Sequence, residues 1–99
     1  MGSIHMLFTV DKETLSKIEE RIKNYMSHII LDNDRYRFIL VPRGKGVTLI
    51  RIRKTPTVTG EYEVSVNGSE DNVLYVFIIG FYTDKIMSKL KTVNIWRFG

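Results

Sequence analysis

The stretch Tyr36–Lys54, YRFILVPRGKGVTLIRIRK, decides the fold that this chain can adopt. In its second half Ile50 and Ile52 alternate with arginines, and a period of two places successive side chains on opposite faces of a strand. The first half alternates in the same way up to Pro42–Gly46, whose proline and two glycines favour a turn. The stretch therefore predicts two neighbouring strands, and the second of them has an apolar face and a basic face.

Two further strands are predicted after this pair. Glu61–Val66 places Tyr62, Val64 and Val66 on one side and polar residues on the other. The run from Val73 to about Tyr82 is apolar on both sides, which predicts a central strand that is covered on two faces. Because the connections between these strands are short, we expect an antiparallel meander.

Amphipathic segments flank the strands. Apolar residues between Leu15 and Ile29 recur at three- and four-residue steps, which predicts a long helix. Asp11 is a suitable N-cap for this helix, since its side chain can accept a hydrogen bond from the first turn. A short second helix is predicted after Thr83 and Asp84, which have the same capping character.

The ends of the chain carry two more apolar segments. Met6–Val10 has the composition of a short strand, and Val93–Phe98 is apolar enough to dock as an edge strand. Residues 1–99 are therefore expected to form a single α+β domain. In this domain a four- to five-stranded antiparallel sheet packs one face against a long N-terminal helix and a short C-terminal helix.

The composition excludes several classes of protein. The chain has 99 residues, a length suited to one domain, and its 43% of hydrophobic residues argues against global disorder. No apolar run reaches the roughly 18–20 residues that a membrane span needs. The absence of cysteine excludes disulfides and thiolate sites and fits a reducing compartment, so we expect a cytoplasmic location. The absence of glutamine and cysteine also favours a thermophilic source.

Positive charge is the main feature that bears on partners. The net charge of +4 is compatible with phosphate-bearing or acidic partners. Cations gather in the Pro42–Gly46 segment, whose glycines would let a nucleic-acid backbone approach, and along the strand that follows it. We therefore predict a basic edge that binds nucleic acid or an acidic partner, formed by Arg43, Lys45, Arg51, Arg53 and Lys54.

A neutralised face is the alternative interpretation of these cations. If the strand that contains the arginines pairs as a hairpin with the strand Glu61–Val66, then Glu61 and Glu63 stand opposite these arginines. Cross-strand ion pairs, worth about 0.2–1 kcal/mol each, would then neutralise much of the positive charge. The phase of the strands also assigns Tyr36, Phe38 and Tyr62 to the core. That assignment argues against a platform for base stacking.

No catalytic or metal-binding constellation is recognisable in the sequence. His5 lies close to the N-terminus, and His28 has a structural explanation as a cation near the end of the long helix. The Asp32–Asp34 segment lacks the glycine of a calcium-binding loop and fits a turn. We predict no cofactor, no metal ion and no catalytic residue, and we expect that the protein is not an enzyme.

Part of the chain resembles the sheet of RelE/ParE-type toxins, small basic proteins of which several cut ribosome-bound messenger RNA. The resemblance rests on the segments Leu49–Arg53, Gly60–Val64, Val73–Phe77 and Thr83–Lys85. It implies Arg51, Arg53 and Tyr82 as suspects for catalysis. The chain departs from the family at Glu63, where the family usually has an arginine, and in its single N-terminal helix. We therefore transfer no catalytic role.

The chain as a whole is similar in length and composition to small orphan proteins of filamentous and rod-shaped crenarchaeal viruses. The similarity lies in its length, in its lack of Cys, Ala and Gln, and in strands rich in Ile, Val and Tyr. These observations indicate a non-enzymatic binding or regulatory protein that contacts nucleic acid or an acidic partner through the basic edge. Two alternatives stay open: a RelE/ParE-like ribonuclease, and an interaction protein that self-associates as a homodimer through a strand edge or the Trp96–Phe98 tail.

Overall fold

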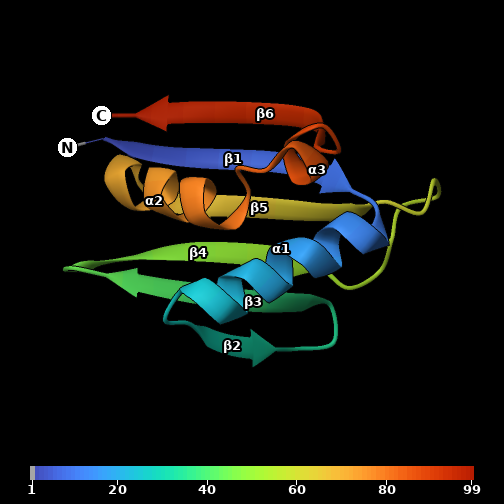
Figure 1. Ribbon diagram of the computed structural model, residues 1–99, viewed down its shortest axis with the longest axis horizontal. Coiled ribbons are helices and arrows are strands. Elements are labelled where there is room, and N and C mark those ends of the chain that lie inside the picture. Colours follow the sequence, from blue (N-terminus) through green and yellow to red (C-terminus); the bar gives the residue numbers. More distant parts are fainter. Residues whose placement is uncertain (1) are drawn as a thin grey trace.

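The computed structural model describes residues 2–99, which form one six-stranded sheet and three helices (Figure 1). The strands are β1 Ser3–Val10, β2 Ile29–Asp32, β3 Tyr36–Arg43, β4 Gly46–Arg53, β5 Tyr62–Ser69 and β6 Lys91–Phe98. The helices are α1 Lys12–Tyr25, α2 Glu70–Gly80 and α3 Asp84–Met87. The predicted α+β class is confirmed, but the sheet has more strands than the four or five expected, and there is a third helix.

The order of the strands is β2-β3-β4-β5-β1-β6, and every neighbouring pair is antiparallel. The short connections produce the expected meander, which runs from β2 to β5. β1 then lies between β5 and β6, so the two terminal strands are neighbours on one side of the sheet (Figure 1). β6 and β2 are therefore the two edges.

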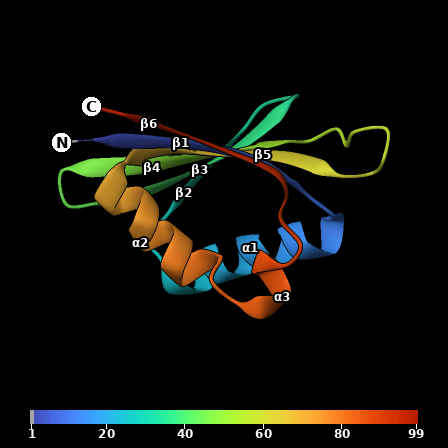
Figure 2. The same ribbon diagram turned by 90° about the horizontal axis from the view of Figure 1, so that it is seen from above.

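All three helices lie on the same face of the sheet, as Figure 2 shows with the sheet seen almost edge-on. The core fills the space between them, and side chains of alternate residues along each strand point into it. The apolar face predicted for Ile50 and Ile52 is confirmed, since both are buried. The other buried apolar strand residues are Ile4, Met6, Phe8, Val10, Ile39, Val41, Val64 and Val66.

Helix α1 begins where the sequence predicts. The backbone N–H of Thr14 donates to the Asp11 carboxylate at 2.7 Å, which confirms Asp11 as the N-cap. The buried residues of α1 are Thr14, Leu15, Ile18 and Ile22. The helix ends at Tyr25, earlier than predicted, because Ile29–Asp32 leaves the helical path and pairs with β3 as edge strand β2.

The predicted central strand Val73–Tyr82 is wrong, because most of this segment belongs to helix α2. The Ser69 hydroxyl accepts a hydrogen bond from the N–H of Asn72 at 3.4 Å and so caps the helix. Two acidic residues in the first turn complement the helix dipole. The buried residues of α2 then recur at helical spacing: Asn72, Val73, Val76 and Gly80.

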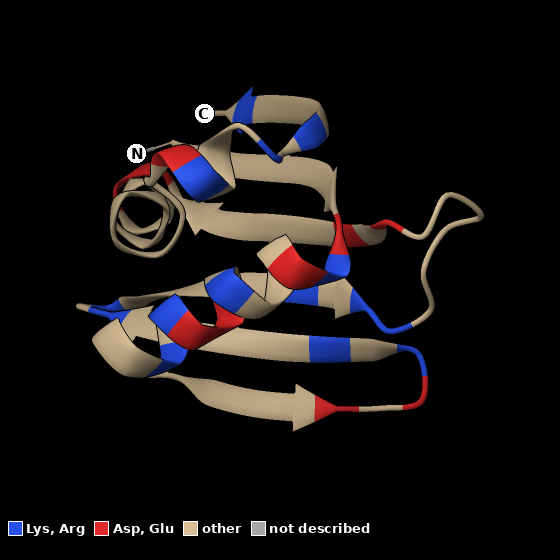
Figure 3. Ribbon diagram, turned by 45° about the vertical axis from the view of Figure 1, so that its right-hand side comes forward, with Lys and Arg blue, Asp and Glu red and all other residues tan. Residues whose placement is uncertain are grey.

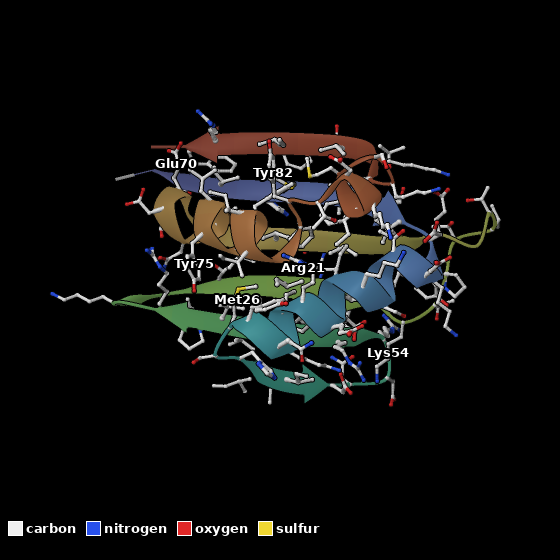
Figure 4. The ribbon with its side chains drawn as sticks, viewed as in Figure 1. Arg21, Met26, Lys54, Glu70, Tyr75 and Tyr82 are labelled. Atoms are coloured by element: carbon white, nitrogen blue, oxygen red, sulfur yellow. The ribbon has the colours of Figure 1, made fainter. Side chains whose placement is uncertain are left out.

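An arginine of α1 fixes the far end of α2. The guanidinium of Arg21 donates two hydrogen bonds to the carbonyl of Ile79, at 2.8 and 3.2 Å. This carbonyl belongs to the last turn of α2, where carbonyls lack partners within the helix. Figure 4 shows Arg21 between the two helices, so the bond sets how α2 lies against α1.

Replacing Asp11 by Ala should lower the free energy of unfolding at pH 7 by about 1 kcal/mol, because Thr14 loses its acceptor. The hydrogen bonds from Thr14 hold the pKa of the Asp11 carboxyl below its ordinary value of 3.8. The carboxylate therefore stabilises the fold above that pH, and its contribution is lost as the pH falls through the lowered pKa. Urea unfolding of the wild type and D11A should accordingly converge in acid.

The control for this prediction is Asp34→Ala. Asp34 is exposed in the turn between β2 and β3 and makes no side-chain hydrogen bond within residues 2–99. Its removal should change the stability by less than about 0.5 kcal/mol. A loss in D11A that is the same at neutral and acid pH would contradict the capping role.

Candidate functional site

One face of the sheet is not covered by any helix of residues 2–99, and we call it the open face (Figure 2). The strand registers bring together side chains of the same phase from all six strands. Those of the open face include Ile29, Leu31, Tyr36, Phe38, Leu40, Leu49, Arg51, Arg53, Glu63, Ser65, His5, Leu7, Asn94, Trp96 and Phe98. A sheet face in solvent is usually polar, whereas this one is rich in apolar and aromatic groups.

Two arginines and two aromatic rings lie together on the open face, on the neighbouring strands β3 and β4. The register of β3 and β4 places Phe38 opposite Arg51 and Tyr36 opposite Arg53. The guanidinium of Arg51 lies 4.9 Å from the centre of the Tyr36 ring, and the Tyr36 and Phe38 rings are 5.9 Å apart. We call Tyr36, Phe38, Arg51 and Arg53 the arginine–aromatic cluster. It combines flat stacking surfaces with positive charge.

The carboxylates neutralise this cluster only in part. Glu63 faces Arg53, but the closest pair of oxygen and nitrogen atoms is 3.9 Å apart and both side chains are well exposed. Glu61 interacts elsewhere, with the ammonium of Lys91 at 3.3 Å. Arg51 lies opposite Ser65 and makes no ion pair within residues 2–99. The predicted neutralisation therefore concerns one arginine, through a weak exposed contact.

The structure corrects the predicted phase of the aromatic residues in β3. Tyr36 and Phe38 were assigned to the core, but they are half-buried on the open face. Ile39 and Val41 are the core residues of this strand. The prediction for Tyr62 is confirmed, because its side chain packs against the core.

A second aromatic pair lies on the same face at the terminal strands. His5 and Trp96 are opposite one another in β1 and β6, and their rings are 5.3 Å apart. His5 is thus part of a paired strand. No sequence pattern predicted this pair, because the two residues are far apart along the chain and meet only through the pairing of β1 with β6.

The five predicted basic residues do not form one edge. Arg43 and Lys45 lie at the β3–β4 hairpin tip, and Arg51, Arg53 and Lys54 lie toward the other end of β4. At about 3.3 Å per residue, the five steps from Gly46 to Arg51 and the seven steps to Arg53 place these arginines about 17 and 23 Å from the hairpin tip. Figure 3 shows the two separate groups of blue segments on these strands.

Of the three predicted cations outside the cluster, Arg43 and Lys54 contact groups on the helix side, whereas Lys45 is exposed at the hairpin tip. The Arg43 guanidinium lies 4.4 Å from the Tyr75 ring centre and within 3.5 Å of the Asn72 side-chain oxygen. The Lys54 ammonium lies 3.8 Å from the Asp32 carboxylate.

The turn at Asp32–Asp34, predicted from the sequence, is confirmed by the Asn33 side chain, which accepts two backbone N–H bonds at 2.8 Å.

Arg37 binds the acidic residues around Lys54. Its guanidinium donates to Asp32 at 3.0 Å and to Glu19 of α1 at 3.0 Å. These hydrogen bonds raise the pKa of Arg37, and the bond from Arg37 lowers the pKa of Asp32. Arg37 therefore ties β2 and β3 to α1 and contributes no free charge to the open face.

The suspects that the toxin resemblance implies do not converge. Arg51 and Arg53 lie on the open face, whereas Tyr82 follows α2 on the helix side of the sheet. Val73–Phe77, which the resemblance assigned to a strand, is helical. The other histidine, His28, lies beyond the end of α1, and its Nδ1 is 2.9 Å from the carbonyl oxygen of Met26.

No protein-family model matches the chain, and comparisons with curated proteins and with solved structures gave no match. Within residues 2–99, no helix is long and apolar enough to cross a membrane. The same residues contain no group of three or more His, Cys, Asp and Glu side chains that could hold a metal ion. The function must therefore be inferred from the surface of the molecule.

The variants Arg51→Ala and Ile50→Ala compare how much the two faces of β4 contribute to the free energy of unfolding. Removing Ile50, which is fully buried, should cost about 2–5 kcal/mol of unfolding free energy. Removing Arg51 should cost no more than about 1 kcal/mol, the value of an exposed cation–π contact. Chemical denaturation of both variants measures the difference. Equal large losses would show that Arg51 is needed for the fold itself.

Proposed function

We propose that this protein binds single-stranded nucleic acid on the open face, through the arginine–aromatic cluster. The observation that supports the proposal is the position of two aromatic rings beside two guanidinium groups on a sheet face without a covering helix. Single strands are bound where positive groups follow the backbone and aromatic side chains stack on the bases. An acidic protein partner would use the charges but has no need for the rings.

The geometry also favours a single strand over a duplex. A broad sheet face offers no helix or ribbon that could enter a major groove. Unpaired bases, in contrast, can lie flat against rings on an open sheet, which is how four-stranded sheets with exposed aromatic residues bind RNA. Each stacked base is worth about 1–3 kcal/mol of binding free energy.

The proposal describes a binding or regulatory protein and includes no reaction. We place its action in the cytoplasm, or in the host-cell cytoplasm if the chain is viral, because a cysteine-free chain fits a reducing compartment. The hairpin tip that carries Arg43 and Lys45 is about 17–23 Å from the arginines of the cluster along β4, so a long single strand would be needed to reach both.

The double variant R51A/R53A tests the charge component. With a labelled oligouridine or oligothymidine and fluorescence anisotropy as the readout, it should raise the dissociation constant at least about tenfold. It should also flatten the dependence of affinity on salt, by roughly 0.7 in logarithmic slope for each lost phosphate contact.

The matched control is K12A/K85A, which removes the same charge from the helix side. Lys12 and Lys85 are exposed and make no ion pair within residues 2–99. Their loss should change the dissociation constant by less than roughly threefold, since distant exposed charges are screened by salt. Equal weakening by both double variants would mean unspecific attraction, and binding of polyglutamate as tight as that of the oligonucleotides would favour an acidic protein partner.

Tyr36→Ala tests the stacking component separately from charge. The variant should weaken binding of the same oligonucleotides by about 1–3 kcal/mol if one base stacks on this ring. Tyr25→Ala is its counterpart on the helix side, where Arg21 lies 5.2 Å from the Tyr25 ring centre, and it should have no effect. Unchanged binding by Y36A would rule out the ring as a base platform.

A further inference from the structure

Strand β6 is an edge that lacks the usual protection against pairing. It pairs with β1 on one side and has no neighbour on the other within residues 2–99. All of its eight residues are exposed, and none is proline. Its large apolar side chains lie on both faces of the strand: Val93, Ile95, Trp96 and Phe98. A long apolar edge of this kind invites another strand.

The two cations of β6 each form an exposed ion pair with an acid of their own chain. The Lys91 ammonium reaches back over β1 to the Glu61 carboxylate at 3.3 Å. The Arg97 guanidinium lies 3.5 Å from the carboxylate of Glu70 in the first turn of α2. Both cations of β6 are therefore paired with acids of their own chain. The free side of the strand is left without an unpaired charge.

The opposite edge, β2, also exposes Ile29 and Leu31, but it differs in its length and in the charges at its end. β2 has four residues, and it ends at Asp32, which binds the cations Arg37 and Lys54. A short strand closed by an ion-pair network is a common way to prevent pairing. The contrast shows that this chain protects one edge and leaves the other available.

Apolar side chains beside β6 extend the same surface on the helix side. Helix α2 leaves Leu74 and Ile78 exposed, and Tyr82 follows its end. In Figure 4 Tyr82 lies on the side of α2 that faces β1 and β6. Ile95 lies opposite the buried Met6 and so shares this side of the sheet, where no helix covers it.

We propose that two copies of this chain form a homodimer by antiparallel pairing of their β6 strands. A two-fold axis perpendicular to the sheet relates the strands, so each edge finds its own pattern of donors and acceptors. Directly opposed residues must point to the same face of the sheet. One residue must therefore lie directly opposite its own copy in the partner strand, and the axis passes midway between these two copies.

Repulsion between the cations of β6 favours the register in which Ile95 lies opposite its own copy. In this register Arg97 lies opposite Val93 of the partner subunit, and the two Arg97 side chains stay four residues apart. An axis through Asn94 would set Arg97 against Lys91 of the partner subunit, and an axis through Trp96 would bring the two Arg97 side chains to within two residues. The backbone supports the same centre, because the regular part of β6 begins after Thr92, whose φ is 48°.

Sedimentation equilibrium of the full chain tests the dimer. The wild type should have twice the monomer mass of 11.6 kDa. Ile95→Lys should raise the dimer dissociation constant roughly 30-fold or more, as for a residue at the centre of an interface. Leu31→Lys is the matched control, because Leu31 lies on the other edge strand and is 56% exposed against 55% for Ile95. It should leave the dimer intact.

Circular dichroism must show that both lysine variants are folded. A wild type that stays monomeric at high concentration, or an Ile95→Lys variant that still dimerises, would overturn the proposal. Loss of the dimer in Leu31→Lys alone would also overturn it, since that result would place the interface at β2.

A cysteine scan tests the register, because the chain has no cysteine of its own. Opposed residues in antiparallel strands have Cα atoms about 4.5–5.5 Å apart, a separation that a disulfide can bridge. Ile95→Cys should therefore form a covalent dimer on oxidation. Asn94→Cys should not, because its counterpart lies two residues away along the partner strand. Cross-linking of Asn94→Cys but not of Ile95→Cys would contradict the proposed axis.

Discussion

The burial of one face of the sheet beneath three helices is the constraint on which every other feature depends. That burial sets the phase of the strands, because Ile39, Ile50 and Val64 are fully removed from solvent and their neighbours along each strand must point the other way. All helices of residues 2–99 lie on the same side, so nothing in that part of the chain covers those neighbours. The apolar and aromatic character of the open face is therefore not needed for the core, which leaves it available for contacts with other molecules.

The hairpin of β3 and β4 shows how far sequence reasoning reaches. The alternation around Ile50 predicts the strand and its arginine face correctly, since only one phase of β4 contains charged residues. The phase of β3 was wrong because both of its faces are apolar, and Phe38 competes with Ile39 for the core. The two-residue turn at Gly44 and Lys45 fixes the register of the hairpin, and this register places Phe38 opposite Arg51. A residue that faces an outward arginine must itself point outward.

Helix α2 was missed for a different physical reason. Its β-branched and aromatic residues favour a strand, and a helix that is apolar on nearly all sides shows no polar face that would reveal its period. The capping sequence from Ser69 to Asn72 was the available signal of a helix N-terminus. For the candidate site, the alternation of β4 correctly placed Arg51 and Arg53 on one face of the strand. The contacts of Arg51 with Tyr36 and of Arg43 with Tyr75 depend on tertiary structure, and the sequence pattern does not reveal them.

The hairpin tip restricts how related sequences can diverge. The Asn72 side chain donates from Nδ2 to the Arg43 carbonyl at 3.2 Å, and a Cβ at Gly46 would come within 2.6 Å of the same Nδ2. Gly44 has a φ of 61° but open space around it, so asparagine, which tolerates this conformation, would fit there. In descendants of this chain, a side chain at position 46 therefore requires a change at position 72, whereas position 44 is restricted by its own backbone conformation to glycine or asparagine.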